Sequence, residues 1–177
     1  MPHYRSPSRL RGGTPIVYLH SSSGPTGRLH LFRELEEVGY SVYAPDMPER
    51  DLRTPAESLL AELYDELGEK STRALSIIGA EGGALAAIDL AVRTPSRVSA
   101  LVLCPPGTRE LDPRGQLSTI DQATLVLWGS ADPVLSSTGV RRYADALPNG
   151  RLETLSGCGH LPAMERPLET AGRIVSF

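Results

Sequence analysis

The stretch ALSIIGAEGGALAAIDLAV, residues 74–92, decides the fold of this chain. It begins with an apolar run typical of a buried strand, passes through the glycine-rich segment 79–83, and continues as a run of helix formers. Glycine has no side chain, so it permits a strained turn and lets a strand and a helix pack closely. The stretch therefore predicts a strand near 73–78, a tight turn, and a helix near 82–93.

One residue of that turn decides the question of function. Gly79 and Gly83 have the spacing of the motif G-x-S-x-G, which holds a serine nucleophile on a sharp strand-to-helix turn. The serine position is occupied by Glu81. The backbone requirement of the motif is kept, so we expect Glu81 to adopt a positive φ. The reacting group is changed.

Strand-like and helix-like segments alternate along the rest of the chain. Strands are expected near 15–20, 41–45, 73–78, 99–104, 123–129 and 151–156, and helices near 27–38, 55–68, 82–93, 136–147 and 164–176. This alternation predicts a mostly parallel sheet of about six strands, covered by helices on both faces. The length favours a single domain over residues 1–177, in which 1–14 form an irregular N-terminal arm or the remnant of a hairpin.

Side chains that can do chemistry follow several of these strands. His20 follows the strand near 15–20, and Asp132 lies in Gly-Ser-Ala-Asp-Pro after the strand near 123–129. His160 lies in Gly-Cys-Gly-His, with Glu-Arg-Pro downstream. Because the carboxyl ends of parallel strands form one edge of a sheet, we expect His20, Glu81, Asp132 and His160 to gather there.

In order and spacing, the motifs around Glu81, Asp132 and His160 are similar to those of the α/β-hydrolase superfamily, and more closely to its small carboxylesterase-like members. The resemblance covers roughly residues 15–177. It implies a three-layer α/β/α fold with Glu81, Asp132 and His160 at the catalytic triad positions. Asp132 would orient His160 and stabilise its charged form.

The same resemblance implies several supporting residues. The backbone N–H groups of Ser22 and Gly82 would form the oxyanion hole, and His20 would brace the loop that carries Ser22. Gly79 and Gly83 would support the turn. The link between Pro105 and Gln122 is too short for a helical cap, so we expect no cap domain and an open, shallow site.

Glu81 leaves three functions open. The first is hydrolysis of small ester-like or related carbonyl substrates at a Glu81-His160-Asp132 site, with Glu81 as a base that activates water. The second is carboxylate chemistry of another kind, with Glu81 as an epoxide hydrolase-like nucleophile or as the base of a lyase or cyclase. The third is a catalytically silent protein, natural or engineered, that binds a ligand or partner. Two anions beside His160 favour the imidazolium, so we expect weak serine-esterase-type activity.

Composition excludes several classes of function. The net charge is −3, without a basic stripe, so we expect no nucleic-acid partner. No apolar run is long enough for a membrane span, and no apolar stretch follows the basic amino end, so we expect neither a membrane segment nor a signal peptide. Two cysteines, Cys104 and Cys158, argue against a disulfide framework and fit a cytoplasmic location. No metal-ligand spacing is present, and no cofactor is expected. The expected partner is a small-molecule substrate, and the oligomeric state is left open.

Overall fold

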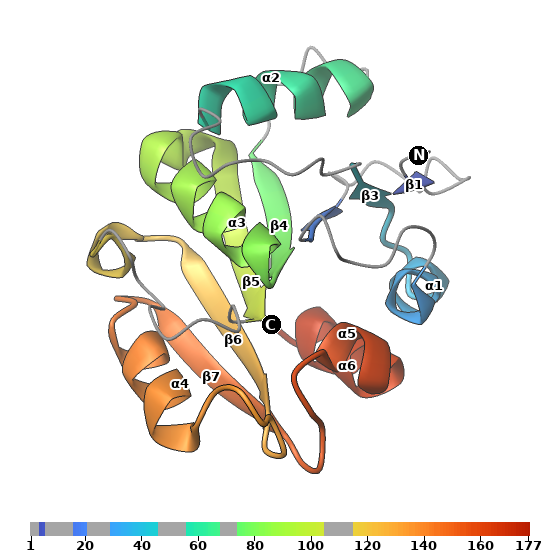
Figure 1. Ribbon diagram of the computed structural model, residues 1–177. Coiled ribbons are helices and arrows are strands. Elements are labelled where there is room, and N and C mark those ends of the chain that lie inside the picture. The colour runs from blue at the N-terminus through green and yellow to red at the C-terminus, as the bar shows by residue number, and fades with distance from the viewer. Residues whose placement is uncertain (1–3, 6–15, 21–28, 46–55, 68–73, 105–114) are drawn as a thin grey trace.

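The strands of this computed structural model form one sheet, shown in Figure 1. The structure describes residues 4–5, 16–20, 29–45, 56–67, 74–104 and 115–177. In these ranges the strands are β1 (Tyr4–Arg5), β2 (Ile16–Leu19), β3 (Val42–Ala44), β4 (Leu75–Ala80), β5 (Val98–Cys104), β6 (Ala123–Gly129) and β7 (Gly150–Leu155). Their order in the sheet is β1-β3-β2-β4-β5-β6-β7. All neighbours pair in parallel except β1, which is antiparallel to β3.

Helices cover both faces of the sheet. They are α1 (His30–Glu37), α2 (Ala56–Leu67), α3 (Gly82–Arg93), α4 (Ser137–Asp145), α5 (Pro162–Glu165) and α6 (Pro167–Val175), with short 3-10 turns at Pro95–Arg97 and Leu117–Thr119. Helices α2, α3 and α4 lie on one side, and α1, α5 and α6 on the other (Figure 1). The three-layer α/β/α fold expected from the sequence is confirmed. No cap domain is evident among the described residues.

Alternation along the strands divides the apolar side chains into two cores. In β2, Val17 and Leu19 pack with α2, α3 and α4, whereas Ile16 and Tyr18 pack with α1, α5 and α6. Successive side chains of a strand point to opposite faces, so each central strand supplies both cores. Burial on both faces is the reason that these strands read as continuous apolar runs.

The glycine-rich turn begins later than expected. Strand β4 extends through Gly79 and Ala80, which pair with Leu103 and Cys104 of β5. Gly79 was expected to start the turn, but a glycine can continue a strand, and this one also pairs with Leu19 of β2. The strand therefore ends immediately before Glu81, which makes Glu81 itself the turn residue.

One expected helix needs correction. The helix expected over 164–176 is two helices, α5 and α6, separated at Arg166, which has φ −137 and ψ 56. Pro167 causes the break, because proline disfavours a helical conformation in the residue before it. Residues 1–14 were expected to form an irregular arm or the remnant of a hairpin; of these the structure describes Tyr4–Arg5, which form the edge strand β1.

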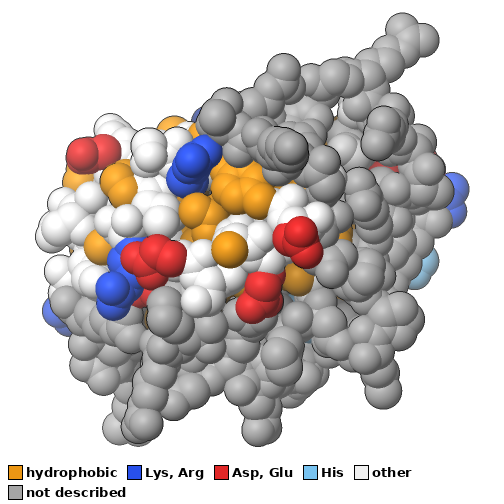
Figure 2. Space-filling model, turned by 90° about the horizontal axis from the view of Figure 1, so that it is seen from above, with side chains coloured by type: hydrophobic (Ala, Val, Ile, Leu, Met, Phe, Trp, Pro, Cys, Tyr) orange, Lys and Arg blue, Asp and Glu red, His pale blue; other side chains and the backbone are white. Residues whose placement is uncertain are grey.

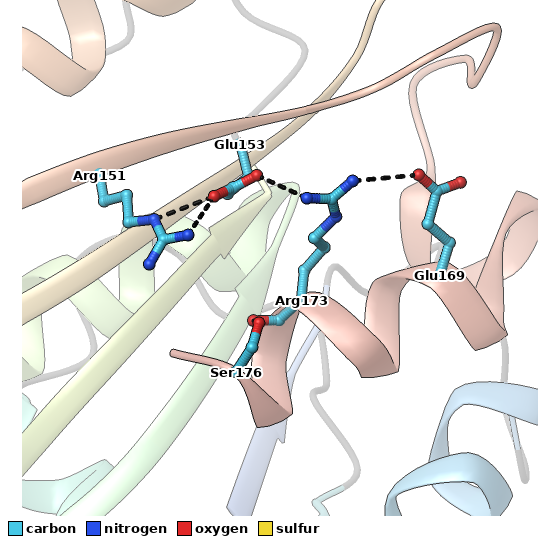
Figure 3. Close-up of polar contacts among 5 residues, drawn as sticks. All are labelled: Arg151, Glu153, Glu169, Arg173 and Ser176. Carbon is cyan, nitrogen blue, oxygen red and sulfur yellow. Dashed lines mark hydrogen bonds and ion pairs between the residues drawn. The ribbon is translucent and has the colours of Figure 1, made fainter.

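An ion-pair network connects the edge strand β7 to α6, as Figure 3 shows. Glu153 of β7 accepts from Arg151 Nε at 2.9 Å and from Arg173 Nη1 at 3.0 Å. Arg173 Nη2 also lies 3.6 Å from Oε1 of Glu169, which is one turn earlier on α6. These partly exposed pairs contribute at most about 1 kcal/mol each, so they are a minor part of the stability of the fold.

The face of the molecule drawn in Figure 2 carries both acidic and basic side chains. Figure 2 shows acidic and basic side chains interspersed around apolar ones over the described part of this face. No described helix has both the length and the hydropathy needed to cross a membrane.

Candidate active site

The candidate site lies where the chain changes direction along the sheet. From β2 the chain passes to β3 on one side, and then returns to β4 on the other side of β2. Such a switch point leaves a crevice at the carboxyl ends of the two diverging strands. A pocket of about 280 Å³ lies there, and its described lining is Tyr18, His20, Ala80, Glu81, Cys104, His160, Leu161, Pro162, Ala163 and Met164.

Glu81 sits in a strained turn at the edge of this pocket. Its φ is 51° and its ψ is −122°, and it has the only positive φ among the described residues other than glycine. The positive φ expected from the sequence is therefore observed. A side chain held in this region costs about 1–3 kcal/mol, which the surrounding structure has to supply.

Gly79 and Gly83 make this turn possible. A Cβ atom on Gly79 would lie 2.7 Å from Ala84 Cα, and one on Gly83 would overlap the carbonyl of Leu19 and lie 2.5 Å from His20 N. The first turn of α3 therefore packs directly against β2 and β4, with no room for a side chain at Gly79 or Gly83. Gly82 is the first residue of α3, so its N–H has no partner within the helix.

His160 and Asp132 form a hydrogen-bonded pair, and His160 lines the same pocket as Glu81. His160 Nδ1 lies 2.8 Å from Asp132 Oδ2, so the contact by which Asp132 was expected to orient His160 is present. The Asp132 side chain is 3% exposed, and its Oδ1 accepts from the amides of Val134 at 2.8 Å and Leu135 at 3.1 Å. Burial alone would raise the pKa of Asp132, but the bonds from His160 and the two amides outweigh it and hold the pKa below its ordinary value.

Further contacts hold the loops that carry Asp132 and His160 against one another. A Cβ atom on Gly129 would overlap the carbonyls of Cys158 and Gly159, so the end of β6 touches the loop that carries His160. Ala131 N–H donates to Cys158 O at 2.8 Å, and Gly157 N–H donates to Ser130 Oγ at 2.9 Å. The turn after β6 and the loop after β7 thus form one bonded unit.

The structure brings together most of the residues singled out in the sequence. Glu81 and His160 line the same pocket, and Asp132 stands behind His160. His20 is buried and also lines the pocket. Ser22 lies outside the described residues, so the oxyanion hole and the bracing role of His20 stay predictions.

Tyr18 is a pocket residue that sequence reasoning missed. Its ring packs edge-on against the ring of Phe32, with 5.1 Å between the ring centres, and stacks on the ring of His20, with 6.3 Å between the centres. Burial, followed by Cys104 and the Glu81 carboxylate, raises the pKa of Tyr18, so the phenol stays protonated and can donate a hydrogen bond. The available signal was the two-residue spacing from His20, which places both side chains on one face of the strand.

Cys104 lines the pocket, but its thiol is not suited to act as a nucleophile. Burial and the nearby Cys158 raise the pKa of Cys104 to about 12, so the thiol is protonated at neutral pH and is not a nucleophile. Among the described residues, no group of three histidine, cysteine or carboxylate side chains is placed to bind a metal ion. The pocket wall formed by 161–164 is largely apolar.

The Asp132 pair predicts a pH-dependent stability. Because its folded-state pKa is lowered, Asp132 stabilises the fold above about pH 4, the ordinary range of this carboxyl, and this contribution is lost as pH falls through the folded-state value. We expect Asp132→Asn to cost roughly 1–3 kcal/mol at pH 7 and progressively less towards pH 2. Urea unfolding of both proteins across this range measures the difference. A cost that does not shrink in acid would contradict the assigned ionisation.

Comparison with known proteins agrees with this architecture. The predicted CIB-like hydrolase from Thermoplasma acidophilum superposes with a TM-score of 0.82 at 26% identity, over 99% of this chain and 90% of that one. MGS-MChE2, an α/β hydrolase from the metagenome of lagoon sediments in Morocco, superposes with a TM-score of 0.72 at 25% identity. The superposition covers 93% of this chain and 90% of that one.

Curated sequences match over a shorter segment. Monoacylglycerol lipase ABHD6 is 39% identical in mouse and 38% in human over 61 residues, which are 34% of this chain. The matched part is 18% of the length of these enzymes. No family model matches the chain. The strand order, the site at the switch point and these structural relatives agree: the chain belongs to the α/β-hydrolase superfamily.

Proposed function

We propose that this protein hydrolyses small ester-like or related carbonyl substrates in the pocket beside Glu81. The observation that carries the proposal is the pocket lined by Glu81 and by His160, which is bonded to Asp132. The name of the matched relative, a monoacylglycerol lipase, supports an ester substrate. The pocket of about 280 Å³ is near the lower end of ligand pockets, which favours a small acyl group.

The chemistry of Glu81 favours attack by water. Direct attack of the carboxylate on an ester carbon would form a high-energy anhydride. As a base, Glu81 would take a proton from water while the water oxygen bonds to the carbonyl carbon. A protonated His160, hydrogen-bonded to Asp132, would then give its proton to the departing alkoxide. The amides of Gly82 and Ser22 would stabilise the intermediate oxyanion.

A silent binding protein is the second candidate. The observation that favours it is Glu81 itself: a carboxylate in the place of serine removes the usual nucleophile and can itself occupy the donors of an oxyanion hole. In that case the same pocket would bind a small ligand without turning it over. Epoxide opening or a lyase step would use the same carboxylate, and assays with such substrates would separate them from ester hydrolysis.

Glu81→Gln tests whether the carboxylate acts as a base. Glutamine keeps the shape of the side chain but cannot take a proton, so we expect hydrolysis of a short p-nitrophenyl ester to fall about 100-fold from a slow native rate. Steady-state kinetics measures this, with His160→Ala as a second inactive variant. Glu57→Gln, at an exposed position on α2, is the matched control. Native turnover no faster than buffer, or equal to that of Glu81→Gln, would favour the silent protein.

A further inference from the structure

Glu165 makes a two-point contact with the backbone on either side of His160. It is the last residue of α5, and its carboxylate turns back towards the loop before the helix. Oε2 accepts from the Gly159 amide at 2.7 Å, and Oε1 accepts from the Leu161 amide at 3.0 Å. One carboxylate therefore binds the backbone amides of the residues immediately before and after His160.

The loop is shaped to receive this carboxylate. A Cβ atom on Gly159 would lie 2.7 Å from both oxygens of Glu165, so only glycine leaves room for the contact. Hydrogen bonds from amides to an ionised carboxylate are stronger than bonds between neutral groups. A four-residue helix such as α5 has little stability of its own, and these two bonds tie its last residue to the loop before it.

We propose that Glu165 is a positioning residue that sets the direction in which the His160 ring faces the pocket. Asp132 holds the ring through one bond to Nδ1, and a single bond leaves the ring free to tilt about it. The carboxylate of Glu165 removes that freedom by fixing the backbone on both sides of the ring. The catalytic consequence rests on the proposed role of His160, but the orientation of the ring does not.

The first experiment observes the ring directly. The chain has four histidines, so proton NMR of protein with 15N-labelled histidine is simple to assign, with His160→Ala identifying the signal of interest. The Nδ1 proton bonded to Asp132 should give a narrow downfield signal in the native protein. Glu165→Gln can accept only one of the two amides and turns an NH2 group towards the other. We expect the signal to broaden or disappear although the circular dichroism spectrum is unchanged.

Glu169→Gln is the matched control. Glu169 lies on the next turn of the same segment, carries the same charge and pairs with Arg173 rather than with the loop (Figure 3). This variant should keep the native His160 signal. An unaltered signal in Glu165→Gln, or equal loss in both variants, would overturn the positioning role.

Kinetics in the Glu81→Ser background supplies the second experiment. A displacement of about 1 Å costs roughly 100-fold in rate, so Glu165→Ala should lower kcat by about 10- to 100-fold with little change in KM. If the serine variant proves inactive, the proposed function fails, while the NMR experiment still decides the role of Glu165.

Gly159→Ala gives an independent check. Its methyl group should displace the Glu165 carboxylate and reproduce the loss caused by Glu165→Ala. Because both changes break the same contact, the double variant should be no worse than either single one. Losses that multiply in the double variant would show that the two residues act separately and would overturn the proposal.

Discussion

Glu81→Ser is expected to raise hydrolysis of a short p-nitrophenyl ester by about 10³-fold or more over the native chain. Serine would supply a hydroxyl nucleophile, and His160 would accept the hydroxyl proton as the general base. It would also form an acyl-enzyme ester instead of an anhydride. The pair of His160 and Asp132 needs no change, because its 2.8 Å bond is already formed.

Two variants define what this result means. His160→Ala in the serine background should abolish the gain, because the hydroxyl then has no base. Glu81→Ala removes the carboxylate without supplying a nucleophile and should stay slow. If the native protein is as fast as the serine variant, Glu81 is already a competent base or nucleophile. If the serine variant folds but stays inactive, the pocket is better explained as a binding site.

Gly83→Ala is expected to destabilise the protein by about 4 kcal/mol or more. The new methyl group would overlap the carbonyl of Leu19 and press against the amide nitrogen of His20. Both belong to the backbone at the end of the central strand β2, which cannot move without breaking its pairing with β3 and β4. Urea unfolding followed by circular dichroism measures the change.

Gly172→Ala serves as the control. Gly172 lies inside α6, and a Cβ atom there would meet nothing within 4 Å. Alanine in a helix interior stabilises a protein by about 0.5–1 kcal/mol relative to glycine, so this variant should be more stable than the native protein. A small cost for Gly83→Ala would mean that α3 can move away from β2, and that the strain at Glu81 is not imposed by this packing.

Local signals predicted the sheet and the backbone at Glu81. Apolar runs and glycine spacing are properties of neighbouring residues, so the alternation of strands and helices and the positive φ could be read directly. The division of 164–176 was missed because the apolar periodicity continues across Arg166, although Pro167 is incompatible with a continuous helix.

The contacts of the site were harder to predict because they join distant residues. The sequence places Asp132 and His160 after strands, but it does not show that Gly129 is needed for the two loops to touch. Tyr18 reads as an ordinary residue of an apolar strand until the pocket is seen. Glu165 was visible only as part of a motif, since its partners are backbone amides, which every sequence contains.

The contact between the turn after β6 and the loop after β7 has an evolutionary consequence. The aspartate and histidine are held to one another by Gly129 and by bonds within residues 129–160, whereas residue 81 comes from the other half of the chain. A substitution at position 81 can therefore change the reacting side chain without disturbing the contact between Asp132 and His160. Such a scaffold can move between reaction types by single mutations, with each intermediate still folded and open to selection.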